Sequence, residues 1–127
     1  MQREQTALRV VKANHGERDG RVRMMFGRYT DGSGVEVEVV ARTVGVLVTD
    51  GGRGIRCGSQ GYPLTDRERH LVRTLTEDFG LKLNGDAVTI VVAEVSDIEG
   101  KRDCVALVST IIEGELSRLR SYGREAA

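Results

Sequence analysis

The spacing of apolar residues along this chain changes more than once, and each change predicts a different kind of element. From Arg21 to Tyr29 and from Val35 to Val40, apolar and polar residues alternate, which is typical of strands with one wet face. Between them, Asp31-Gly32-Ser33-Gly34 favours a hairpin turn. Val44 to Thr49 predicts a third strand, and Gly54 to Cys57 a short fourth. Together these segments predict an antiparallel meander of four strands.

Helical spacing dominates the rest of the chain. Thr65-Asp66-Arg67-Glu68 is a capping box, in which the side chains of the first and last residues each accept a hydrogen bond from the other's backbone amide. An apolar stripe follows, and Gly80 ends this predicted helix. A long final helix is expected from about Lys101 to Ser121. Ser96-Asp97-Ile98-Glu99 resembles a second capping box in front of it.

A second hairpin and two chain ends complete the predicted fold. Leu81 to Leu83 and Ala87 to Ala93 flank the turn sequence Asn84-Gly85-Asp86. Gln2 to Ala13 predicts a helix within the first 16 residues, and the tail Gly123 to Ala127 is expected to fray. The predicted order is α-ββββ-α-ββ-α. It indicates a single α+β domain over residues 1–127, with a mostly antiparallel sheet and helices packed on one face.

Composition and charge narrow the class of protein. The chain has 127 residues, of which 39% are hydrophobic and 30% are charged, as is ordinary for one globular domain. Nineteen basic and nineteen acidic residues leave no net charge, whereas nucleic-acid-binding proteins usually carry a basic excess. No apolar run approaches the length of a membrane span, and the first residues do not resemble a secretory signal. We therefore expect a cytoplasmic protein with no membrane partner.

Candidate chemistry is sparse. The glycine-rich stretch Gly51-Gly52-Arg53-Gly54 lacks the third glycine of a dinucleotide fingerprint, because Cys57 stands there. His70 has no second metal ligand at a spacing known from zinc sites. We expect no cofactor and no metal, and we expect Cys57 and Cys104 to be reduced thiols. Asp50, His70 and Cys57 are the polar residues that an enzyme with a site assembled from distant segments would use.

Two surfaces are candidates for partner binding. The apolar arc of the last helix is wider than one side of a small sheet needs, so it either lies fully in the core or also forms a partner or self-association face. Its candidate contact residues are Ile112, Leu116 and Leu119. The second candidate is a basic patch formed by Arg53, Arg56, Arg67, Arg69 and Arg73. These side chains either bind phosphate or an acidic partner, or form a solvated face with helix ion pairs.

The order of several motifs resembles a small bacterial and prophage family that is known only as a domain of unknown function. The motifs are Asp50-Gly51-Gly52, the run Arg69 to Val72, Phe79-Gly80 and Asn84-Gly85, and the resemblance extends from about Gly20 to Leu119. It implies a phage or mobile-element setting, in which small proteins often bind host machinery.

The leading interpretation is a non-enzymatic protein-binding module, in its narrowest form a phage-encoded inhibitor of a bacterial defence complex of the anti-CRISPR kind. A host protein complex would be the partner, and the last helix could also support a homodimer. Nucleic-acid binding through the arginine patch and an enzyme with an unrecognised site are the alternatives.

Overall fold

The computed structural model describes residues 21–126, with side chains up to Ser121, so the helix predicted for Gln2 to Ala13 lies outside the described residues. Five strands form one antiparallel sheet in the order β1-β2-β3-β5-β4, which confirms the α+β class. The strands are β1 (Arg21–Arg28), β2 (Gly34–Arg42), β3 (Gly45–Thr49), β4 (Lys82–Asn84) and β5 (Ala87–Val92). The helices are α2 (Arg53–Ser59), α3 (Asp66–Asp78), the short 3-10 helix η1 (Val95–Asp97) and α4 (Ile98–Ala126).

The alternation predicted for the first strands determines which face of the sheet enters the core. Val39 on β2 lies opposite Val22 on β1 and Val48 on β3, and all three side chains are buried. On the other face of the same strands, Arg23 lies opposite Glu38 and pairs with it at 3.4 Å. One face therefore packs in the core, and the other carries charged side chains.

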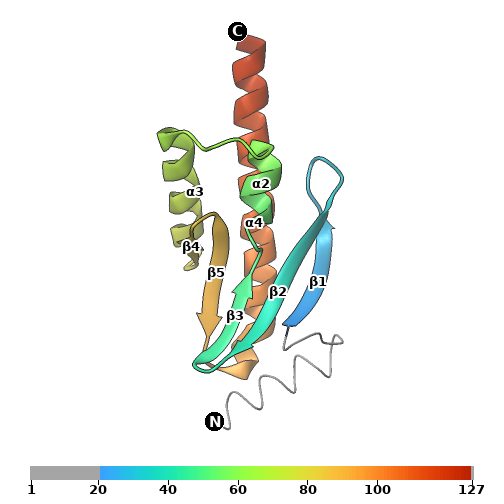
Figure 1. Ribbon diagram of the computed structural model, residues 1–127, viewed down its shortest axis with the longest axis vertical. Helices are drawn as coiled ribbons and strands as arrows, with labels where there is room; N and C mark the ends of the chain where they lie inside the picture. Colours follow the sequence, from blue (N-terminus) through green and yellow to red (C-terminus); the bar gives the residue numbers. More distant parts are fainter. Residues whose placement is uncertain (1–20, 127) are drawn as a thin grey trace.

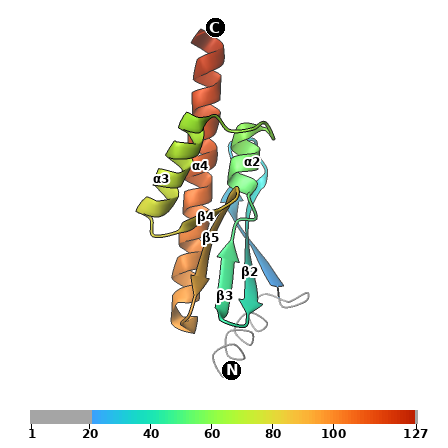
Figure 2. The same cartoon turned by 60° about the vertical axis from the view of Figure 1, so that its left-hand side comes forward.

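Helix α4 covers the buried face of the sheet. It runs along the whole length of the strands, with α3 beside it, and its last turns project past the rest of the domain (Figures 1 and 2). Val105, Val108, Ile112 and Leu116 point into the core and are buried, which explains most of the apolar arc of this helix. The predicted packing of helices on one face of the sheet is confirmed for the described residues.

The segment Gly54 to Cys57 is the helix α2, so the prediction of a fourth meander strand there was wrong. Gly51 and Gly52 adopt positive φ angles of 65° and 82°, which turn the chain sharply at the end of β3. The carboxylate of Asp50 then accepts hydrogen bonds from the amides of Gly52 and Gly54, as a helix-capping side chain does. β5 takes the place beside β3 that the predicted strand would have occupied.

The ends of the two longer helices differ in how well they were predicted. The capping box of Thr65 and Glu68 is present at the start of α3, with both reciprocal hydrogen bonds. In place of the second predicted capping box, η1 precedes α4, and no side-chain hydrogen bond caps the start of η1. α4 begins at Ile98 and continues to Ala126, through most of the predicted tail.

Candidate functional site

The apolar residues expected to contact a partner lie mostly in the core. Ile112 and Leu116 are completely buried, and Leu119 is half-buried. α4 is covered by the sheet, by α2 and by α3, so a wide apolar arc is what its packing requires. The interpretation of Ile112 and Leu116 as surface contacts is therefore wrong for the domain as folded. The arc belongs to the core, which was the other interpretation of the same pattern.

The side of α4 that faces away from the sheet carries a different set of residues, which we call the outer strip. It consists of Gly100, Asp103, Cys104, Leu107, Ile111, Gly114, Arg118 and Ser121. Leu107 is 51% exposed, and Cys104 and Ile111 are half-buried. Phe79, which is 39% exposed at the end of α3, adjoins this strip because its carbonyl oxygen lies 3.9 Å from the sulfur of Cys104. The sequence already indicated these residues, since Cys104, Leu107 and Ile111 widen the predicted arc.

Ion pairs and hydrogen bonds within the chain occupy three of the five predicted arginines, and the other two, Arg67 and Arg73, are exposed on α3. Arg53 lies 3.1 Å from Glu36 on the outer face of the sheet, and Arg69 lies 3.5 Å from Asp86 in the β4–β5 turn. Arg56 donates to the carbonyl of Gly51 at 3.0 Å.

The β4–β5 turn brings two of these arginines to the same region of the surface. A Cβ added at Gly52 would lie 3.5 Å from the Asp86 carbonyl oxygen and 3.8 Å from the Arg56 guanidinium. Arg56 and Arg69 thus approach the same turn from α2 and α3, and the exposed Arg73 follows one turn further along α3. Arg53 instead faces the sheet through its pair with Glu36. The acidic partners reduce the positive charge that this patch offers to phosphate.

A buried polar network joins α2, α4 and the β1–β2 hairpin. Asp50 is 1% exposed, and its carboxylate accepts hydrogen bonds from the amides of Gly52, Gly54 and Val88 and from the hydroxyl of Ser109 at 2.7 Å. The hydroxyl groups of Ser109 and Tyr29 are hydrogen-bonded to each other at 2.6 Å. Burial raises the pKa of the Tyr29 phenol to about 12, so the phenol is neutral under ordinary conditions.

Glu113 extends the network one turn further along α4. It is 1% exposed, and its carboxylate accepts hydrogen bonds from the amide and hydroxyl of Thr30 and from the hydroxyl of Ser117. A buried carboxylate is tolerated only when donors surround it. Glu113 therefore fastens the β1–β2 hairpin to α4.

Of the three residues proposed for a dispersed enzyme site, Asp50 and Cys57 share Tyr29 as a neighbour, because both contribute, after burial, to the raised pKa of its phenol. The carboxylate of Asp50 is fully engaged with the network described above, and His70 is exposed on α3. The sulfur of the half-buried Cys57 lies 3.7 Å from the Ser33 hydroxyl. Within residues 21–126, no cluster of three or more His, Cys, Asp or Glu side chains could hold a metal ion.

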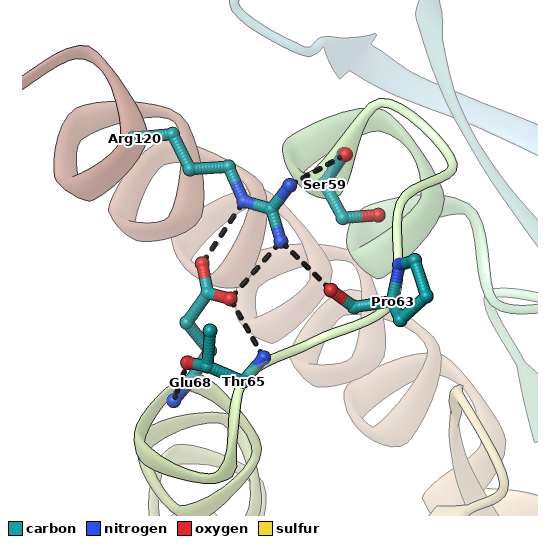
Figure 3. Close-up of polar contacts among 5 residues, drawn as sticks. All are labelled: Ser59, Pro63, Thr65, Glu68 and Arg120. Carbon is teal, nitrogen blue, oxygen red and sulfur yellow. Dashed lines mark hydrogen bonds and ion pairs between the residues drawn. The ribbon is translucent and has the colours of Figure 1, made fainter. Parts of the chain in front are cut away.

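Arg120 fastens the far end of α4 to the two preceding helices (Figure 3). Its guanidinium donates to both carboxylate oxygens of Glu68, at 2.9 and 3.0 Å, and to the carbonyls of Ser59 and Pro63, at 2.9 and 3.3 Å. Burial alone would raise the pKa of Glu68, but the hydrogen bonds and charge of Arg120, with the amide of Thr65, hold that pKa below its usual value. The sequence predicts the role of Glu68 in the capping box, whereas its ion pair with Arg120, 52 residues away, leaves no local pattern.

The fold and these contacts define an α+β domain in which buried carboxylates connect the helices and the first hairpin. Its large exposed apolar side chain on α4, Leu107, lies on the outer strip. No family model, curated protein or solved structure matches the chain. In the part of the chain that the structure describes, none of the helices combines the length and apolarity needed to cross a membrane.

Proposed function

We propose that this chain is a non-enzymatic protein-binding module that contacts its partner through the outer strip of α4 and the adjoining Phe79. The observation that carries the proposal is the exposure of Leu107 and Phe79, two large apolar side chains on neighbouring helices. Exposed apolar groups that cluster on one surface gain free energy when a partner covers them. The charged residues Asp103 and Arg118 flank the apolar part of the strip, as polar rims flank protein interfaces.

The polar residues support binding rather than catalysis. Asp50, Glu68 and Glu113 are the buried carboxylates of the described domain, and each one accepts several hydrogen bonds from other elements of the chain. A catalytic carboxylate needs a free position toward a substrate. These three carboxylates use their oxygens to hold the helices and the first hairpin together.

Nucleic-acid binding is the weaker alternative because Arg53 and Arg69 each have an acidic partner. A basic patch gains affinity for phosphate by releasing counterions, and an acidic side chain beside each arginine reduces that gain. If the patch bound nucleic acid, the affinity would fall steeply as salt increases.

The test is an affinity capture from bacterial lysate, with and without nuclease, that compares wild type with Leu107→Glu. Val44→Glu is the matched control, because Val44 is 84% exposed in the turn between β2 and β3 and away from the outer strip. We expect a protein partner that survives nuclease treatment, remains bound to the control and is lost with Leu107→Glu. Circular dichroism of both variants establishes that they fold. Capture that disappears with nuclease, or that Leu107→Glu leaves unchanged, would refute the proposal.

The narrower form of the proposal is inhibition of a bacterial defence complex, and it is supported only by the resemblance to a prophage family. A plating assay tests it, in which phage are titred on defence-proficient bacteria that express wild type or Leu107→Glu. We expect wild type alone to restore plaque formation. Equal plaque numbers with wild type and with an empty vector would refute this narrower form.

A further inference from the structure

The outer strip has the residue spacing of a helix that packs along another helix. Cys104, Leu107, Ile111, Gly114, Arg118 and Ser121 follow one another at intervals of three, four, three, four and three residues. This is the 3.5-residue repeat that keeps one side of a helix directed at a partner helix. α4 has 29 residues and is therefore about 43 Å long, so the strip offers a long contact line.

Two glycines in α4 leave the helix backbone without side chains at two positions of the outer strip. A Cβ added at Gly100 or at Gly114 would meet no other atom within 4 Å, so neither glycine is needed for packing inside the domain. A glycine inside a helix costs about 1 kcal/mol relative to alanine. The same residues would allow the backbone of a second helix to approach closely, as small residues do at tight helix contacts.

When the outer strips of two copies lie antiparallel, the charges and side-chain sizes of one strip are complementary to those of the other. If two α4 helices lie antiparallel with a two-fold axis between Thr110 and Ile111, Leu107 of one copy faces Gly114 of the other. The same register places Asp103 opposite Arg118. Within the chain Asp103 lies 3.9 Å from Arg102 and Arg118 lies 2.6 Å from Glu115, but both side chains remain 61% exposed, so each can also face an opposite charge of a second copy. A parallel arrangement would instead place like charges side by side.

From this complementarity we infer that the occupant of the outer strip is a second copy of this chain, bound as an antiparallel two-fold dimer of α4 helices. The inference rests on the proposed function, because it names the partner that the same surface binds. A two-fold interface uses the same patch on both copies, so the Leu107–Gly114 contact and the Asp103–Arg118 pair each occur twice. The antiparallel direction also sets the positive end of each helix dipole beside the negative end of the other.

Sedimentation velocity of the full chain across a range of protein concentrations tests this inference. We expect wild type to shift from monomer to dimer as concentration rises. Gly114→Arg should remain a monomer at every concentration, because its side chain fills the space that Leu107 of the second copy requires. The variant should keep the fold, since the position is open in the monomer and arginine is a better helix former than glycine.

A charge exchange tests the register. Asp103→Arg or Arg118→Asp alone should weaken the dimer by roughly tenfold, because each change replaces two attractive pairs by two repulsive ones. The double variant should recover the wild-type dissociation constant. A dimer that tolerates Gly114→Arg, or single variants that dimerise as well as wild type, would overturn the inference. A wild-type monomer that still captures another protein through Leu107 would overturn the dimer and leave the proposed function standing.

Discussion

Replacing Gly54 by alanine should destabilise this protein, although alanine is the better helix former by about 1 kcal/mol. A Cβ at this position in α2 would lie 2.6 Å from the Ser109 hydroxyl oxygen and 2.7 Å from the Ser109 carbonyl oxygen. Carbon–oxygen contacts in proteins begin near about 3.3 Å. The 2.7 Å contact is about 0.6 Å shorter, so α2 would have to move away from α4 by about that distance.

The cost of this movement follows from what it separates. Overpacking in a core costs about 1–3 kcal/mol. The displacement also strains the buried hydrogen bond between Ser109 and Asp50, which contributes about 1 kcal/mol. After the helix gain of about 1 kcal/mol is subtracted, we expect Gly54→Ala to lower the free energy of unfolding by about 2 kcal/mol.

Urea denaturation followed by circular dichroism measures this change, and Gly114→Ala is the matched control. Gly114 is also a helical glycine, but a Cβ there meets no atom within 4 Å, so alanine should raise the free energy of unfolding by about 0.5–1 kcal/mol. Each variant is measured at two protein concentrations, because self-association would add to apparent stability. If both substitutions stabilise the protein, the close approach of α2 and α4 does not exist as described.

Two further predictions concern the buried polar groups. Arg120→Ala should cost about 3 kcal/mol in urea denaturation, because it leaves the Glu68 carboxylate buried without its partner. Arg118→Ala is the matched control and should leave stability nearly unchanged, because its ion pair with Glu115 is exposed and screened by solvent. Since folding lowers the pKa of Glu68, its contribution to stability is present above the unfolded value of 4.5 and is lost as pH falls through the folded pKa. Glu68→Gln should therefore lose less stability in acid than wild type. An equal loss of stability in both proteins would contradict this assignment. Tyr29→Phe should cost about 1 kcal/mol through the lost bond to Ser109. Because burial raises the pKa of Tyr29 from 10.0 to about 12, wild-type stability should fall as pH rises from 10 to 12, and the Phe variant should fall less over the same range.

The parts of the fold that sequence predicted correctly depend on neighbours in the chain. The Thr65–Glu68 capping box is decided within one turn of helix, and the hairpin at Asn84-Gly85-Asp86 by its two flanking strands. α2 was mistaken for a strand because its sequence shows no clear period. Its helical state depends on Asp50, which caps its start, and on Ser109 of α4, against which Gly54 packs.

The candidate binding site could be predicted only in part, for a related reason. The sequence showed that α4 carries a broad apolar arc, but it could not show which side of the arc the domain would cover. α2 approaches α4 at Gly54 and Gly58, where a Cβ would come within 3.2 Å of Ser109 or Glu113 atoms, and this contact helps to determine which side of α4 is covered. Ile112 is therefore buried, and Leu107 remains exposed on the side that no described element covers.

Four of the helical glycines of α2 and α4 separate into two pairs that need different explanations. Gly54 and Gly58 permit close contact between helices of the same chain, so the stability that they cost α2 is offset within the domain. Gly100 and Gly114 cost α4 a similar amount, and their Cβ positions face open space. A second helix that packs on the outer strip would supply the missing compensation. In that case Gly114→Ala stabilises the single chain and weakens its self-association. If the variant were both more stable and more strongly self-associating than wild type, this glycine would serve no interface.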